Sequence, residues 1–234
     1  MANFVLVHGG WYGGWIWKRV ARHLRDKGHD VYTPTLTGLA DRSHLLTAGV
    51  NLSTHIQDIV SLIQFEELKG VILCGHSYGG MVISGVADRI SEHISSLVYL
   101  DAWYPNDGDS LFTLSSDAAQ LANIKNIGRY GGIARPPIPA DVLNVNERDR
   151  AWVEKMSTLH PAASMFEGIR LQGNHLKVKK LTYIMTSLKM PQLMQFYERL
   201  QKDPAWITRT IESGHDAMLD NPEGVVKLLH EAIT

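Results

Sequence analysis

Short apolar runs alternate with amphipathic stretches along most of the chain. Six runs rich in aliphatic and β-branched residues have the length of buried strands: residues 3–8, 29–34, 71–76, 95–101, 181–187 and 206–212. Stretches with helical spacing lie between or after them, at residues 14–27, 53–68, 78–90, 190–201 and 222–233. Strands that alternate with helices predict an α/β fold, with a mostly parallel sheet of about six strands flanked by helices.

Residues 104–178 interrupt this alternation. They contain glycine, proline and weak helical patterns, but no convincing strand. A segment of this length inside a compact α/β domain is typical of a functional insertion. We therefore expect a single domain over residues 1–234, in which residues 104–178 form a mostly helical lid.

The overall charge gives no sign of a nucleic-acid or membrane partner. The 234 residues include 23 Lys and Arg against 24 Asp and Glu, so the formal net charge is -1, and no basic binding face is expected. No apolar stretch approaches the ~18 residues that a membrane span requires, and no basic region precedes the first apolar run. We expect a cytoplasmic protein that acts on a small molecule.

The stretch GHSYG, residues 75–79, has the G-x-S-x-G form of a nucleophilic serine. It lies where that motif belongs, because an apolar strand ends just before Ser77 and a helical stretch follows it. Glycines around the serine let the strand and the helix approach closely across a sharp, strained turn. We interpret Ser77 as the nucleophile, with a glycine-rich packing turn as the alternative.

A second glycine-rich turn, HGGWYGGWIW at residues 8–17, follows the first strand. An open main chain near the start of a helix can direct backbone N–H groups at the oxygen that becomes negatively charged during acyl transfer. We predict Gly10 and Tyr78, the residue after the nucleophile, as the oxyanion donors. A phosphate-binding loop is the alternative, but neither G-x-G-x-x-G nor G-x-x-x-x-G-K-[ST] occurs here.

The stretch ESGHDAMLDNP, residues 212–222, contains the candidate general base. His215 lies just after the last predicted strand, at the same edge of the sheet as the serine, and follows the serine in the chain. A lone histidine is more often structural, but the other ten histidines have no comparable context. No H-E-x-x-H or clustered ligand spacing occurs, so neither a metal nor another cofactor is expected.

Five segments together resemble the α/β-hydrolases: HGGWYGGWIW, TPTLTGLADR, GHSYGG, YLDAWYP and GHDAML. Within that superfamily the chain is similar to small hydrolases related to plant methyl-salicylate esterases and hydroxynitrile lyases, and most similar to their bacterial carboxylesterase branch. That branch also includes carbamate-hydrolysing esterases. The resemblance covers residues 3–105 and 180–232 well and the predicted lid only loosely.

Two positions argue against a lyase. The hydroxynitrile lyases have a threonine after the first-strand histidine and a lysine after the catalytic histidine, where this chain has Gly9 and Asp216. A carboxylate beside the base would repel cyanide rather than stabilise it.

The acid of the predicted triad is the least obvious member. Many α/β-hydrolases, including the plant relatives, place it after the strand that here spans 181–187, yet residues 182–197 contain no Asp or Glu. Asp101 ends the strand that follows the nucleophile's strand, and it preserves the order Ser, Asp, His. We predict Asp101, with loop capping as its alternative role and with Asp203 and Glu198 as weaker rivals.

Aromatic and methionine side chains near these motifs predict an apolar substrate pocket. The residues expected to line it are Trp11, Trp103, Trp152, Phe166 and Met218. Lys and Arg do not cluster at the motif loops, so a highly anionic substrate is not expected.

The sequence therefore predicts a serine carboxylesterase that cleaves small, largely apolar or aromatic esters through an acyl-enzyme. Hydrolysis of a carbamate or an activated amide remains open, since it uses the same chemistry. A ligand-binding receptor with little turnover is a further alternative, against which the intact Ser77 and His215 argue. The oligomeric state is left open, with a homodimer as one possibility.

Overall fold

A computed structural model describes residues 1–233, and its centre is a sheet of six parallel strands. Neighbouring strands follow the order β2-β1-β3-β4-β7-β8. The strands are β1 (Asn3–Val7), β2 (Asp30–Tyr32), β3 (Val71–His76), β4 (Ile94–Leu100), β7 (Lys180–Thr186) and β8 (Trp206–Ile211). Each predicted strand is present, and the predicted α/β-hydrolase fold is confirmed.

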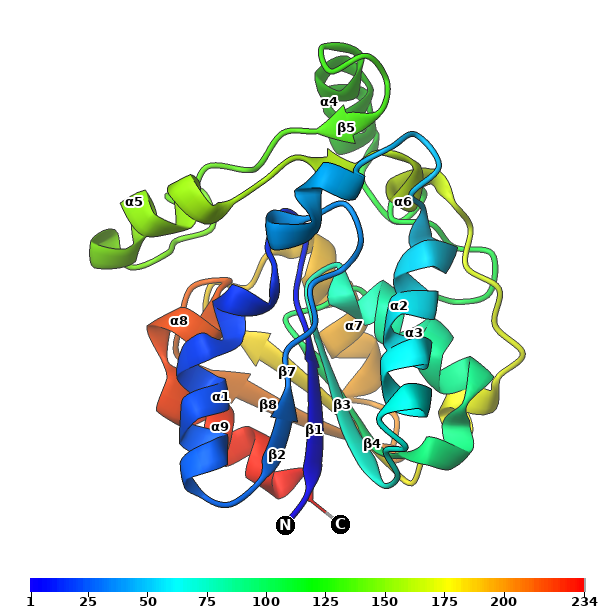
Figure 1. Ribbon diagram of the computed structural model, residues 1–234, viewed down its shortest axis with the longest axis vertical. Helices are drawn as coiled ribbons and strands as arrows, with labels where there is room; N and C mark the ends of the chain where they lie inside the picture. Colours follow the sequence, from blue (N-terminus) through cyan, green and yellow to red (C-terminus); the bar gives the residue numbers. More distant parts are fainter. Residues whose placement is uncertain (234) are drawn as a thin grey trace.

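Helices cover both faces of the sheet. Helices α1 (Lys18–Asp26) and α9 (Pro222–Glu231) pack together on one face, and α2 (Leu52–Phe65), α3 (Gly79–Arg89) and α7 (Pro191–Leu200) lie on the other (Figure 1). Short helical turns lie between these elements: η1 (Gly14–Trp17), η2 (Ala40–Leu45), η3 (Ser91–His93) and α8 (Ala217–Asp220). Among the helices described for residues 1–233, none is long and apolar enough to cross a bilayer.

Alternate residues of each strand enter different hydrophobic cores. In β1, Phe4 and Leu6 pack under α1 and α9, whereas Val5 and Val7 pack under α2 and α3. All four side chains are fully buried. A parallel strand that is covered on both faces is apolar at every position rather than at every second one, which is why central strands such as β1 and β3 read as continuous apolar runs.

The order of the strands places the motif loops at one edge of the sheet. The chain runs from β1 outward to β2, then returns past β1 to β3 and continues outward in the other direction. The loops after β1 and β3 therefore diverge at a topological switch point, where open α/β sheets bind ligands. The loops after β4 and β8 end at the same carboxyl edge, because all six strands are parallel.

Residues 104–178 contain α4 (Asp117–Gly128), β5 (Ala134–Arg135), α5 (Glu147–Met156), β6 (His160–Pro161), α6 (Ala163–Phe166) and η4 (Asn174–Lys177). Much of this segment, including α4, β5 and α6, lies above the carboxyl edge of the sheet in Figure 1, whereas its last part runs down beside α3. The expectation of no strand is wrong in detail, since β5 and β6 form an antiparallel pair. Strands of two residues are too short for an alternating pattern to reveal them. That this segment acts as a lid stays a prediction.

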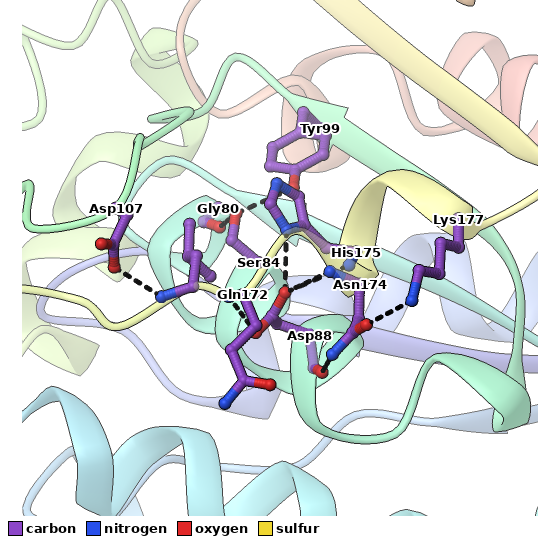
Figure 2. A network of polar contacts seen from close by, with 10 residues as sticks. Gly80, Ser84, Asp88, Tyr99, Asp107, Gln172, Asn174, His175 and Lys177 are labelled. Atoms are coloured by element: carbon purple, nitrogen blue, oxygen red, sulfur yellow. Dashed lines mark hydrogen bonds and ion pairs between the residues drawn. The ribbon is translucent and has the colours of Figure 1, made fainter.

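A buried carboxylate ties the end of the insertion to α3. Asp88 accepts hydrogen bonds from the backbone N–H of Gln172 and of Asn174, both at 2.7 Å, and lies 3.2 Å from the ring of His175 (Figure 2). These bonds satisfy backbone groups of an otherwise irregular segment. They hold the returning chain against the core just before it enters β7.

Candidate active site

Ser77 occupies the sharp turn between β3 and α3. Its φ is 52°, a left-handed conformation that is rare for a residue with a side chain. The turn is tight because the strand and the helix nearly touch. A Cβ at Gly79 would lie 2.8 Å from the carbonyl oxygen of Val7, and one at Gly75 would lie 2.6 Å from the carbonyl oxygen of Gly79. The motif glycines therefore allow the close approach that directs Ser77 away from the sheet.

His215 and Asp101 meet at the carboxyl edge of the sheet. The Nδ1 atom of His215 lies 2.6 Å from the Oδ2 atom of Asp101, and both side chains are buried. Asp101 follows β4 directly, with φ at 44°, and also accepts a hydrogen bond from the backbone N–H of Thr186 at the end of β7. The backbone of His215 is fixed as well, because His76 donates a hydrogen bond to its carbonyl oxygen.

The contact with Asp101 affects the pKa of the His215 imidazole. Burial lowers the pKa of His215, but the hydrogen bond and the negative charge of Asp101, together with the charge of Asp216, outweigh burial, so the pKa lies above its usual value of 6.5. A histidine held in this way has its Nδ1 proton directed at the carboxylate. Its Nε2 atom is then the one that can accept a proton.

Ser77 and His215 line the same cavity. No hydrogen bond joins the Ser77 hydroxyl to the His215 ring within residues 1–233. Hydrogen bonds of this kind are often long without substrate and shorten in the reacting complex. The geometry thus brings together the three residues predicted as a triad, and their catalytic roles stay predictions.

The two predicted oxyanion donors, Gly10 and Tyr78, also line this cavity. Next to Gly10, Trp11 has a φ of 66°, and its backbone N–H lies 3.4 Å from Nδ1 of His160. No hydrogen-bond acceptor is found for the N–H of Gly10 or Tyr78 in the part of the chain that the structure describes. The two groups are therefore available to an oxygen placed near Ser77, as the prediction requires.

The cavity has a volume of about 230 Å³, and both apolar and polar side chains line it. Trp11 and Trp103 line it, as expected from the sequence. Its other apolar lining residues are Leu111, Ala119, Ile138, Leu143, Met190 and Leu193. A larger surface groove beside α2, of about 920 Å³, contains none of the predicted catalytic residues.

Three residues predicted for the pocket do not line it. Trp152 is 37% exposed and packs edge-on against Trp15, and Phe166 is 45% exposed. Met218 is fully buried in the core under α1 and α9. The prediction was wrong for these residues because closeness in sequence to a motif, or membership of the insertion, does not determine which way a side chain points.

Two ionisable residues of the cavity were missed. Arg135 of β5 and His160 of β6 both line it, and the two strands pair through these residues. Burial holds the pKa of His160 well below its usual range, so its ring is neutral. No local pattern marks either residue, because a contact between two short strands of the insertion brings them to the site.

Asp216 does not face the cavity, although it follows His215. Its buried side chain accepts a hydrogen bond from the Tyr12 hydroxyl at 2.8 Å, and burial raises its pKa to about 6. The expectation that this carboxylate would repel cyanide in the pocket is therefore revised. Asp216 connects the loop that contains His215 to Tyr12 and does not line the cavity.

The rival acids lie elsewhere. Asp203 is exposed and accepts a hydrogen bond from the backbone N–H of Ala205, and Glu198 is exposed on α7. Of the candidate acids, Asp101 is the one that contacts His215. No group of three or more His, Cys, Asp or Glu side chains that could hold a metal ion occurs among the described residues.

A strained serine, an Asp–His pair and a glycine-rich loop on a parallel sheet define the site of an α/β-fold hydrolase. The chain belongs to the alpha/beta hydrolase family, whose model matches residues 4–228.

Among its relatives is a carbendazim hydrolyzing esterase of Nocardioides sp. (strain SG-4G), 42% identical over 238 residues and 98% of each chain. Methyl jasmonate esterase 1 of Vitis vinifera is 31% identical over 122 residues, which cover 50% of this chain and 46% of that protein. The fold is similar to an extracellular alpha/beta-hydrolase from a Paenibacillus species, with a TM-score of 0.84, 22% identity and 99% of each chain covered. The predicted class, a carboxylic ester hydrolase, is confirmed by these findings.

Proposed function

We propose that this protein is a serine carboxylesterase that uses Ser77, His215 and Asp101. One observation carries the proposal: a buried imidazole held at 2.6 Å by Asp101 lines the same cavity as a serine in a left-handed turn. A serine hydroxyl reacts at neutral pH only when a base removes its proton, and this base is oriented by a carboxylate.

The reaction follows from these positions. The Ser77 oxygen attacks the ester carbonyl carbon while Nε2 of His215 takes the hydroxyl proton, and Asp101 stabilises the imidazolium. The N–H groups of Gly10 and Tyr78 bind the oxyanion. When the tetrahedral intermediate collapses, the alcohol leaves with the proton from His215. Water then attacks the acyl-enzyme by the same proton route, releasing the acid and restoring Ser77.

Carbamate hydrolysis is the second candidate. The relative with 42% identity over nearly the whole chain is named for hydrolysis of carbendazim. Ester and carbamate cleavage need the same nucleophile, base and oxyanion donors, and differ in the group beside the carbonyl. Comparing kcat/KM for a methyl ester and a methyl carbamate of the same aromatic group separates the two.

The test of the mechanism is a burst experiment with p-nitrophenyl acetate. We expect one equivalent of p-nitrophenol per active site before steady turnover, and loss of both phases in Ser77→Ala, because the covalent step needs the hydroxyl. Ser95→Ala, at the opposite end of β4, is the matched control and should keep both phases. A variant Ser77→Ala that turns over at the wild-type rate would refute the mechanism, and a wild-type protein that binds the ester without releasing any p-nitrophenol would favour the receptor.

The cytoplasmic location and the homodimer remain predictions. Cell fractionation tests the first. Light scattering in solution tests the second.

A further inference from the structure

Arg135 brings a positive charge into the cavity that contains Ser77. It lies on β5, and its side chain is partly buried. Its guanidinium carbon lies 4.6 Å from the centre of the Trp11 ring, so the two planes form a cation–π contact. One guanidinium nitrogen also approaches the Met165 sulfur at 4.0 Å. These contacts hold the side chain but use little of its hydrogen-bonding capacity.

The guanidinium has no carboxylate partner. Within residues 1–233, no Asp or Glu oxygen lies within 4.0 Å of it, and no acidic residue lines the cavity. Buried arginines are normally paired, because removing a charge from water is costly unless an opposite charge or several acceptors replace the water. Arg19, which is partly exposed, shows the contrast: its guanidinium forms a two-point ion pair with Asp149.

Arg135 remains charged despite its burial. Burial lowers its pKa to about 10, which is still far above neutral pH. The neighbouring ring of His160 is neutral, so it neither repels nor compensates this charge. The cavity therefore has one fixed cation, on the wall that the insertion contributes.

We propose that Arg135 binds an anionic group of the substrate, and that the natural substrate is a small ester that also carries a carboxylate. This inference rests on the proposed esterase function and narrows its substrate class. A guanidinium presents parallel N–H donors that match the two oxygens of a carboxylate. An anion there would supply the partner that the protein itself does not provide.

The size and lining of the cavity agree with a small half-ester. Its volume of about 230 Å³ lies below the ~300–1,000 Å³ of typical ligand pockets. Leu111 and Leu193 offer an apolar path, and the amide of the buried Asn123 and the hydroxyl of Ser115 add polar contacts. A short aliphatic chain with the reacting ester at one end and a carboxylate at the other fits this arrangement.

The experiment compares esters of equal shape that differ in charge. Monomethyl succinate, glutarate and adipate each have a neutral counterpart in which the carboxylate is replaced by an isopropyl-type branch, such as methyl 4-methylpentanoate for monomethyl succinate. We expect at least one half-ester to exceed its counterpart in kcat/KM by about 10- to 100-fold, the range of a hydrogen-bonded charge pair. Three chain lengths are used because the distance between Ser77 and Arg135 determines which half-ester can contact both residues.

Three variants test the assignment. Arg135→Gln should remove this preference, because it should lower kcat/KM on the half-ester at least about tenfold more than on the neutral ester, mainly through KM. Arg135→Lys keeps the positive charge but lacks the parallel N–H donors of the guanidinium, so it should retain part of the preference for the half-ester. Arg129→Gln, an exposed position of the same insertion, should behave as wild type. A wild-type preference for all three neutral esters, or an equal loss on charged and neutral esters in Arg135→Gln, would overturn the proposal.

Binding without turnover separates this inference from the proposed function. Calorimetry with Ser77→Ala should show tighter binding of the preferred half-ester than of its neutral counterpart, and the added change Arg135→Gln should abolish the difference. If the wild-type protein cleaves no ester but this binding difference is present, the esterase proposal fails and the anion site stands. If the difference is absent, the anion site fails whatever the activity.

Discussion

At the scale of single residues, Asp101 is the sharpest test of the proposed site. Asp101→Asn removes the charge that orients His215 and stabilises its protonated form, so kcat should fall by about 10³- to 10⁴-fold with the fold intact. The same change should move the acid limb of the pH–kcat/KM profile to lower pH, because Asp101 raises the pKa of His215.

Asp203→Asn is the control for this prediction. It makes the same chemical change at an exposed rival position and should leave both kcat and the pH profile unaltered. An equal loss in the two variants, or a loss below about tenfold in Asp101→Asn, would contradict the role proposed for Asp101.

Asp216 predicts an unusual dependence of stability on pH. Burial raises its pKa from 3.8 to about 6 in the folded protein. Between these values the folded state retains a proton that the unfolded state has lost, so stability falls as pH rises through this window. Above it the cost is on the order of 3 kcal/mol. Asp216→Asn should therefore melt higher than wild type at pH 8, with the gap closing near pH 4.

Thermal melting at several pH values measures this gap. Asp26→Asn, at an exposed position of α1, supplies the control and should show no comparable gap. A wild-type protein that melts as high as Asp216→Asn at pH 8 would show that the carboxylate is better compensated than its surroundings indicate.

At the scale of elements, the start of α3 depends on its glycines. A Cβ at Gly80 would overlap the carbonyl oxygen of Trp103 and lie 3.0 Å from the Ala102 side chain. Gly80→Ala should lower the free energy of unfolding by about 1–3 kcal/mol, since backbone must move. It should also lower kcat, because the displaced loop begins at Asp101.

Gly128→Ala, at the end of α4, is matched to this change. Nothing lies within 4 Å of a Cβ there, so stability should change by less than about 0.5 kcal/mol. Urea unfolding measures both variants. Equal stability of the two would mean that α3 can shift away from the loop at little cost.

At the scale of the whole molecule, the sheet and the insertion differ in the share of their side chains that is buried. All six residues of β3 are buried, whereas α4 buries only Asn123 and Ile127 among its described residues, and exposes 70% of Leu121 and 53% of Ile124. Amide hydrogen exchange should therefore be slowest in β3 and β4 and faster in α4, which opens locally. An α4 as protected as β3 would contradict a lid that opens without unfolding of the core.

The sequence by itself determined the order of strands and helices and two of the candidate site residues. Buried parallel strands must be apolar on both faces, so central strands such as β1 and β3 left continuous apolar runs. The serine turn needs small neighbours at set spacings, so Ser77 is marked by local residues alone. His215 is marked by its place after the last strand. Each of these features depends on residues that are close together in the chain, so a short stretch of sequence is enough to reveal it.

Only the tertiary structure decided which side chains share the cavity. Asp101 was distinguished from its rivals by a 2.6 Å contact with a residue far along the chain. Arg135 reaches the site through the pairing of β5 with β6, while Trp152 turns outward to Trp15. The insertion has weak periodicity and two-residue strands, so long-range packing rather than local pattern sets its side-chain directions. The charge that we propose to select the substrate therefore has no signature in the sequence.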